Sequence, residues 1–263
     1  MKNDAAVRQA RHGRVLSLVL NNPAQRNALR PDTSHAMAQA IRLAAEDDGI
    51  GAVVISGAGE HFCAGGDLRS LGESRRNRPR QHLYERISNL NEFVRAIRQC
   101  ERPVIAAIEG HAAGAGCVIA LACDLIVAAE DAHFTMAYVK AGLNPDGAGT
   151  WFLQRAVPPQ LAAEMALTGV AVGAPRLAEL GAVNRIAPKG SALPEALEWA
   201  AKLAAGPMRA IGRIKRLLNE APGHDYLEQL ELEREFMVEA LHGEEAGEGI
   251  AAFLEKRPPR FVR

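Results

Sequence analysis

Short apolar runs alternate in the first 190 residues with longer segments in which apolar residues recur every three or four positions. The short runs are typical of buried strands and cover Arg14–Leu20, Ala52–Ile55, Pro103–Ile108 and Leu125–Ala128. Helical spacing covers Asp32–Glu46, Gln81–Cys100 and the small-residue segment His111–Cys123. Strands that alternate with helices at this spacing predict parallel β-α-β units.

Beyond about residue 190 the apolar pattern is helical only. The expected helices are Leu193–Ala205, Met208–Asn219, Tyr226–Leu241 and Glu245–Glu255. We therefore divide the chain into an α/β core, residues 1–190, and a C-terminal helical region, residues 191–263.

Two glycine-rich turns, here called the elbows, each follow an apolar strand. The first lies in Gly51–Leu68, GAVVISGAGEHFCAGGDL, and the second in Ile108–Asp124, IEGHAAGAGCVIALACD. Small residues allow a helix and a strand to approach closely, which is one interpretation. The other is functional, because helix starts leave backbone N–H groups unpaired, and two such groups that converge form an oxyanion hole.

Several ordered motifs resemble the enoyl-CoA hydratase/isomerase, or crotonase, family. They are NNPAQRNAL (Asn21–Leu29), HFCAGGDL (His61–Leu68), GHAAGAGCVIALACD (Gly110–Asp124), GLNPDGAGTWFLQRAV (Gly142–Val157) and GIAAFLEKRPPRF (Gly249–Phe261). The resemblance implies an α/β fold, a spiral of ββα units with a C-terminal helical trimerisation region. It also implies that the ligands are acyl-CoA thioesters, with coenzyme A as part of the substrate and no separate cofactor. The assembly that it implies is a homotrimer or a dimer of trimers.

The resemblance also assigns roles to individual positions. The oxyanion-hole donors it implies are the backbone N–H groups of Ala64 and Ala115. Arg26, Ala28 and Leu29 are expected along the nucleotide and pantetheine, with Phe253 and Lys256 closing over it, although Lys256 is equally consistent with an ordinary surface lysine. The remaining expected substrate contacts are Gly66, Asp67, Leu68, Gly114 and Tyr138.

The proton-transfer groups distinguish among the family's reactions. Members that hydrate a double bond hold a water between two glutamates, and the matching positions here are Val118 and Tyr138. Valine exchanges no proton, and a tyrosine with a pKa near 10 is a poor base at neutral pH. Asp146, in LNPDGAGT, is the remaining candidate. Its alternatives are a helix N-cap, a proton shuttle between C2 and C4 of the acyl chain, and a nucleophile as in 4-chlorobenzoyl-CoA dehalogenase.

Three functions stay open at this point. We expect an enoyl-CoA or epoxyacyl-CoA isomerase, with PDGAGTWFLQR most similar to the epoxide isomerase of phenylacetate breakdown. The alternatives are a hydratase or dehalogenase-like hydrolase of the same fold, and an acyl-CoA-binding protein without turnover.

Composition narrows the class of protein. The chain has 31 Lys and Arg against 31 Asp and Glu, which argues against nucleic-acid binding. No apolar run approaches the length of a membrane span and the N-terminus lacks the apolar core of a signal peptide, so we expect a cytoplasmic protein. Four cysteines without metal spacing favour reduced, buried thiols and no metal site.

Five more residues or segments have simpler interpretations. Ser74–Arg80 is expected to be a solvated loop, with an anion site as the alternative. Asp67 fits a helix start, Asp124 a structural role, and His61 and His111 turn caps.

Overall fold

The computed structural model describes residues 5–77 and 79–261. A six-stranded sheet has the order β1-β2-β3-β4-β6-β9, in which β1 is antiparallel to β2 and every other pair is parallel. A three-stranded sheet has the order β5-β7-β8. The strands are β1 (Val7–His12), β2 (Val15–Leu20), β3 (Ala52–Gly57), β4 (Val104–Ile108), β5 (His111–Ala113), β6 (Leu125–Ala129), β7 (His133–Thr135), β8 (Ala171–Gly173) and β9 (Arg185–Ala187).

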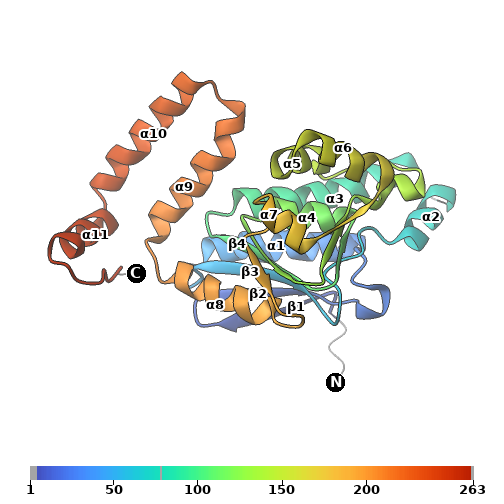
Figure 1. The fold of residues 1–263 in the computed structure, drawn as a ribbon, viewed down its shortest axis with the longest axis horizontal. Coiled ribbons are helices and arrows are strands. Elements are labelled where there is room, and N and C mark those ends of the chain that lie inside the picture. The colour runs from blue at the N-terminus through green and yellow to red at the C-terminus, as the bar shows by residue number, and fades with distance from the viewer. Residues whose placement is uncertain (1–4, 78, 262–263) are drawn as a thin grey trace.

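The helices surround the large sheet and then leave it (Figure 1). They are α1 (Pro31–Glu46), α2 (Leu68–Asn77), α3 (Arg80–Gln99), α4 (Ala115–Ala122), α5 (Gly149–Ala156), α6 (Pro159–Thr168), α7 (Ala174–Glu179), α8 (Ala192–Ala204), α9 (Met208–Glu220), α10 (Tyr226–Leu241) and α11 (Glu244–Leu254). Short 3-10 turns cover η1 (Pro23–Gln25), η2 (Ala137–Ala141) and η3 (Ala221–Gly223).

Both faces of the central strands are buried, which explains their continuous apolar runs. Val53 and Ile55 of β3 face the core shared with α1 and α3, whereas Ala52 and Val54 face α8. The α8 face consists of alanines at every fourth position, Ala192, Ala196, Ala200 and Ala204. These small side chains let α8 lie close against the sheet.

The C-terminal helices α9, α10 and α11 form an arm that projects away from the sheet (Figure 1). Lys215 of α9, 7% exposed, ties this arm to the core. Its ammonium lies 2.7 Å from Asp124 Oδ2 and donates to the carbonyl of Ile97 at 2.8 Å. Asp124 also accepts from Val104 N–H at 2.7 Å, so its structural role is confirmed. The division of the chain between residues 190 and 191 stays a prediction. The helix α8, which follows this division, covers one face of the sheet.

Three local expectations were wrong. His111–Cys123 is not one helix, because Gly114, with φ of 53°, separates β5 from α4. The expected Ser74–Arg80 loop is helical at Ser74–Asn77 and again from Arg80; Arg78 lies outside the described residues. No turn-capping hydrogen bond of His61 or His111 is found among the described residues, and their rings lie 5.1 Å apart instead.

Candidate active site

The two elbows meet where β3 and β4 end. Gly65 has φ of 88°, and a Cβ at that position would stand 2.7 Å from Ala113 O and 3.2 Å from Ala115 N. Only glycine fits such a close approach in this backbone conformation. The elbows therefore lie side by side, as expected for two sources of convergent amides.

The first amide of the pair differs from the expectation. Ala64 N–H donates to Arg26 O at 2.9 Å, so it is already engaged and the prediction that Ala64 supplies a donor was wrong. Gly66 N–H and Ala115 N–H have no hydrogen-bond partner in the described part of the chain. Ala115 is the first residue of α4, where the helix dipole favours negative charge. Gly66 N–H therefore replaces Ala64 N–H as the candidate donor of the first elbow, beside Ala115 N–H of the second.

A short backbone ladder joins the segment Arg26–Leu29 to the first elbow. Besides the Ala64–Arg26 bond, Leu29 N–H donates to Gly65 O at 2.7 Å and Asp67 N–H donates to Leu29 O at 3.2 Å. Arg26 is exposed, whereas the side chains of Ala28 and Leu29 are buried. The sequence therefore brings this expected ligand-binding segment directly against the oxyanion-hole loop.

Asn27 supports this ladder and was not singled out from the sequence. It is 1% exposed with φ of 57°, and its Nδ2 donates to Ala58 O at 2.9 Å and to His61 O at 2.6 Å. An asparagine tolerates the left-handed conformation and can bond backbone groups on both sides. The signal in the sequence was Asn27, the last residue of the turn NNPAQRN.

Asp146 lies on the loop between η2 and α5, half-buried and close to α4. The neighbouring Gly147, with φ of 58°, has no room for a side chain, since a Cβ would stand 3.2 Å from Val118 Cγ1 and 3.3 Å from Leu90 Cδ2. The loop is thus packed on the first turn of α4, the helix that presents Ala115. Asp146 does not cap α5. The N-cap residue of α5 is Ala148, and no side-chain hydrogen bond caps this helix.

Tyr138 contacts Asp146 directly. Its hydroxyl donates to Asp146 Oδ1 at 2.7 Å. Burial raises the pKa of Asp146, and the hydrogen bond from Tyr138 opposes that shift. Burial, followed by the charge of Asp146, raises the pKa of Tyr138 far above its ordinary value, so the hydroxyl stays protonated. Tyr138 thus occupies Oδ1, and the backbone N–H of Asp146 also bonds to its own carboxylate.

The other expected residues fall into two groups. Asp67 accepts from Arg69 N–H at 3.0 Å and from Ser70 N–H at 3.4 Å, which confirms its role at the start of α2; Leu68 is exposed on the same turn. Phe253, 83% exposed, lies on α11, and Lys256 follows that helix. The arm that carries them lies away from α2 and α5, so within one chain they do not close over the site (Figure 1).

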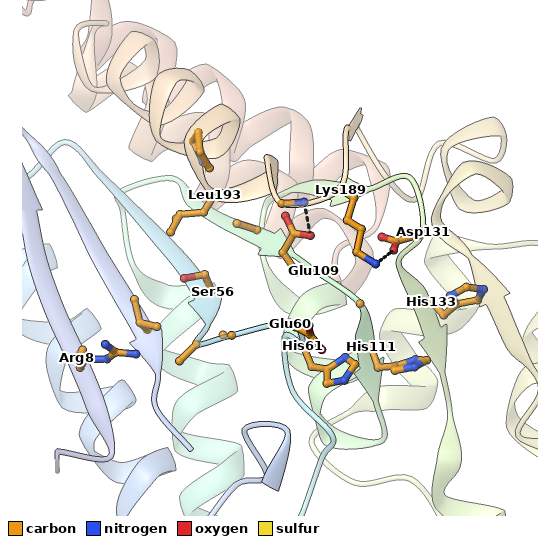
Figure 2. A pocket seen from close by; sticks show the side chains of 18 of the residues that line it. Arg8, Ser56, Glu60, His61, Glu109, His111, Asp131, His133, Lys189 and Leu193 are labelled. Carbon is orange, nitrogen blue, oxygen red and sulfur yellow. Dashed lines mark hydrogen bonds and ion pairs between the residues drawn. The ribbon is translucent and has the colours of Figure 1, made fainter. Parts of the chain in front are cut away.

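A separate pocket of about 1010 Å³ touches the elbows at His61 and Gly110. Figure 2 shows His111 and His133 on the neighbouring strands β5 and β7, with His61 of the first elbow beside His111. Lys189 pairs with Asp131 at 2.9 Å. Glu109 accepts from Gly190 N–H at 3.0 Å at the edge of this pocket. Gly66, Ala115, Tyr138 and Asp146 do not line it, so this pocket is distinct from the candidate active site.

Residues 5–77 and 79–261 contain no group of three or more His, Cys, Asp or Glu side chains able to hold a metal ion. In the same ranges no helix has the length and apolar character required to cross a membrane. The four cysteines are buried free thiols.

Comparison with known proteins identifies the class that this fold and site define. The model of the enoyl-CoA hydratase/isomerase family matches residues 10–263. A 1,2-epoxyphenylacetyl-CoA isomerase of Escherichia coli is 34% identical over 94% of this chain and 95% of its own. A 2,3-dehydroadipyl-CoA hydratase of the same organism is 35% identical over 96% of each chain. The chain belongs to the enoyl-CoA hydratase/isomerase family.

Solved structures agree on the fold. The crystal structure of an enoyl-CoA hydratase from Polaromonas sp. JS666 superposes with a TM-score of 0.95 at 44% identity, covering 98% of this chain and all of the other. A structure from Streptomyces coelicolor described as a putative enoyl-CoA hydratase gives a TM-score of 0.94 at 30% identity. The expected crotonase fold is confirmed, and the protein is an acyl-CoA enzyme of this family.

Proposed function

We propose that the protein is an isomerase of unsaturated or epoxidised acyl-CoA thioesters in which Asp146 moves the proton. The observation that carries this proposal is the hydrogen bond between Tyr138 and Asp146. It holds a half-buried carboxylate on the loop whose Gly147 packs on Val118, the position at which hydrating relatives need a glutamate. A half-buried carboxylate with a raised pKa is suited to general acid–base work.

The steps follow from the positions of the groups. The thioester oxygen accepts hydrogen bonds from Gly66 N–H and Ala115 N–H, which stabilise the enolate as charge develops. The carboxylate of Asp146 takes a proton from C2 or C4 of an enoyl thioester and returns it at the other end of the allylic system. Double-bond position changes, and no water is added.

We also propose that the arm assembles copies of the chain into a trimer or a dimer of trimers. Phe253 and Lys256 would then approach the nucleotide of a thioester bound to a neighbouring copy. The arm's exposed apolar residues, described in the Discussion, support this assembly. The protein is proposed to act in the cytoplasm without a metal or a separate cofactor.

The decisive experiment follows isotopes in acyl-CoA substrates incubated with the protein in D₂O and in ¹⁸O-labelled water. We expect deuterium at C2 or C4 with the natural protein and none with Asp146→Asn. Incorporation of solvent oxygen into the acyl chain would instead indicate a hydratase or a hydrolytic dehalogenase. Thioester binding with neither isotope event would indicate a binding protein without turnover.

A further inference from the structure

Arg86 is a buried positive charge on the core-facing side of α3. It is 9% exposed and stands four residues before Leu90, so the two side chains share one face of the helix. Leu90 packs on Gly147, next to Asp146. Arg86 therefore lies one helical turn, about 6 Å along the axis, from the residue that contacts the loop of Asp146.

The guanidinium also lies against the first elbow. Its Nη1 donates to Ser70 Oγ at 2.6 Å, and its Nη2 donates to Asp67 O at 3.4 Å. Asp67 directly follows Gly66, whose amide is one of the two free donors. Leu71 stands over Gly66, with its Cδ1 3.2 Å from where a Cβ on Gly66 would be. Arg86 thus lies between the elbow, α2 and the helix that contacts the Asp146 loop.

This charge lacks a carboxylate of its own. Across residues 5–77 and 79–261, no Asp or Glu oxygen lies within 4.0 Å of the Arg86 guanidinium. The carboxylate of Asp67 is turned to the start of α2 instead. Burial lowers the pKa of Arg86, and the charge of Asp67 only opposes that shift. A guanidinium has five N–H donors, and buried charges are ordinarily paired, so this one has donors and charge available for a ligand.

We propose that Arg86 binds a carboxylate at the far end of the acyl group, which makes thioesters of dicarboxylic acids the preferred substrate class. The proposal depends on the proposed function for placing the thioester at Gly66 and Ala115. A carboxylate matches the planar fork of arginine with two parallel hydrogen bonds, and it neutralises the buried charge. An acyl chain that ends in a methyl group leaves the Arg86 guanidinium without a carboxylate partner, as in the free protein.

The test measures binding rather than turnover, with saturated probes. Dissociation constants of adipyl-CoA, hexanoyl-CoA and free CoA are measured by calorimetry for the natural protein, Arg86→Met and Arg86→Lys. The control is Arg95→Met, which removes an exposed arginine of α3 that pairs with Glu92. We expect adipyl-CoA to bind the natural protein about tenfold or more tightly than hexanoyl-CoA, as a charge-assisted hydrogen bond predicts. Arg86→Met should erase this preference by weakening adipyl-CoA alone, Arg86→Lys should keep part of it, and Arg95→Met should keep all of it.

Two results would overturn the proposal. Equal affinity of the natural protein for adipyl-CoA and hexanoyl-CoA would exclude recognition of the terminal carboxylate. Equal weakening of all three ligands by Arg86→Met would mean that the guanidinium positions α2 or contacts coenzyme A itself. Because saturated thioesters bind without isomerisation, a preference for adipyl-CoA can hold even if the deuterium experiment rejects Asp146 as the proton shuttle.

Discussion

The hydroxyl of Tyr138 makes the two carboxylate oxygens of Asp146 unequal. Oδ1 accepts a hydrogen bond from the phenol at 2.7 Å, whereas Oδ2 has no hydrogen bond from a side chain of the described residues. A base that transfers a proton between two carbons must stay in one orientation throughout. In the proposed mechanism Tyr138 is therefore a positioning residue for Asp146, and its hydrogen bond also favours the ionised form of the carboxylate.

Replacing Tyr138 with phenylalanine tests this role. We expect kcat to fall about 10- to 100-fold, the effect of losing a hydrogen bond to a charged group, with a smaller change in KM. Asp146 must be ionised to accept a proton, so activity is lost as pH falls through its raised pKa. Because the Tyr138 bond lowers that pKa, its removal should move the acidic limb of the kcat/KM profile to higher pH.

The pH profile separates positioning from a purely structural effect. A loss of activity with an unmoved acidic limb would mean that Tyr138 supports the fold alone. The matched control is Tyr84→Phe, because Tyr84 is an exposed tyrosine of α3 whose hydroxyl makes no hydrogen bond to a described residue.

The free amide of Gly66 gives a second prediction. Gly66→Pro deletes that N–H, and we expect kcat to fall about 10²- to 10³-fold, as for other oxyanion-hole donors. Circular dichroism and melting temperature establish that the variant is folded. Unchanged kcat in a folded variant would remove Gly66 from the oxyanion hole.

Sequence reasoning located the elbows but not the correct amide. The glycines and alanines of HFCAGGDL predicted a turn with exposed backbone, and the turn is there. Which N–H is free depends on Arg26, a distant residue whose carbonyl accepts from Ala64. Tyr138 was likewise placed near the substrate, but its bond to Asp146 depends on how the 146–149 loop folds back on α4. Such pairings are properties of the folded chain.

At the scale of helices and strands, the strong apolar patterns were predicted well and the weak ones were missed. Gln81–Cys100 matches α3 to within a residue at each end. The edge strand β1, VRQARH, was missed because only Val7 of its six residues is buried. The strands β5, β7 and β8 have three residues each, too few to show a period. The arginine-rich α2 buries only Ser74, so its sequence resembles a loop.

The contact between α9 and the core gives a prediction of stability. Lys215→Met leaves Asp124, whose side chain is 18% exposed, with Arg98 at 4.0 Å as its remaining ion pair. Losing one partner of a buried ion pair costs about 3–5 kcal/mol. We expect that loss in the free energy of unfolding measured with urea. Asp124→Asn in the same chain should restore part of it.

An exposed ion pair provides the control for this measurement. Lys202 pairs with Glu198 on the outer face of α8, and both side chains are 66% exposed. Lys202→Met should cost no more than about 1 kcal/mol. Equal effects of the two lysine substitutions would contradict the assignment of Lys215 as the anchor of the arm.

At the scale of the whole molecule, the arm carries more apolar surface than a single chain covers. Its residues that are at least half exposed are Ile214, Leu218, Tyr226, Leu227, Leu230, Met237, Val238, Leu241, Ile250, Phe253 and Leu254. An apolar patch of this extent is typical of a subunit interface. A second copy of the chain is the partner we propose for it.

Light scattering after gel filtration tests the assembly. We expect the natural protein to have the mass of three or six chains and Leu230→Glu with Val238→Glu to have the mass of one. Leu167→Glu, at a 74% exposed leucine of α6 outside the arm, should leave the mass unchanged. A natural protein that is monomeric at micromolar concentration would exclude the arm as an interface.

The backbone ladder between Arg26–Leu29 and the first elbow has a consequence for how this enzyme can change. Its hydrogen bonds join the segment Arg26–Leu29, which is expected to contact the nucleotide, to the loop that presents Gly66. The nucleotide of the thioester, far from the reacting carbons, is therefore expected to bind the same backbone unit that presents the Gly66 amide to the developing negative charge. We therefore expect mutations in Arg26–Leu29 to alter turnover together with affinity.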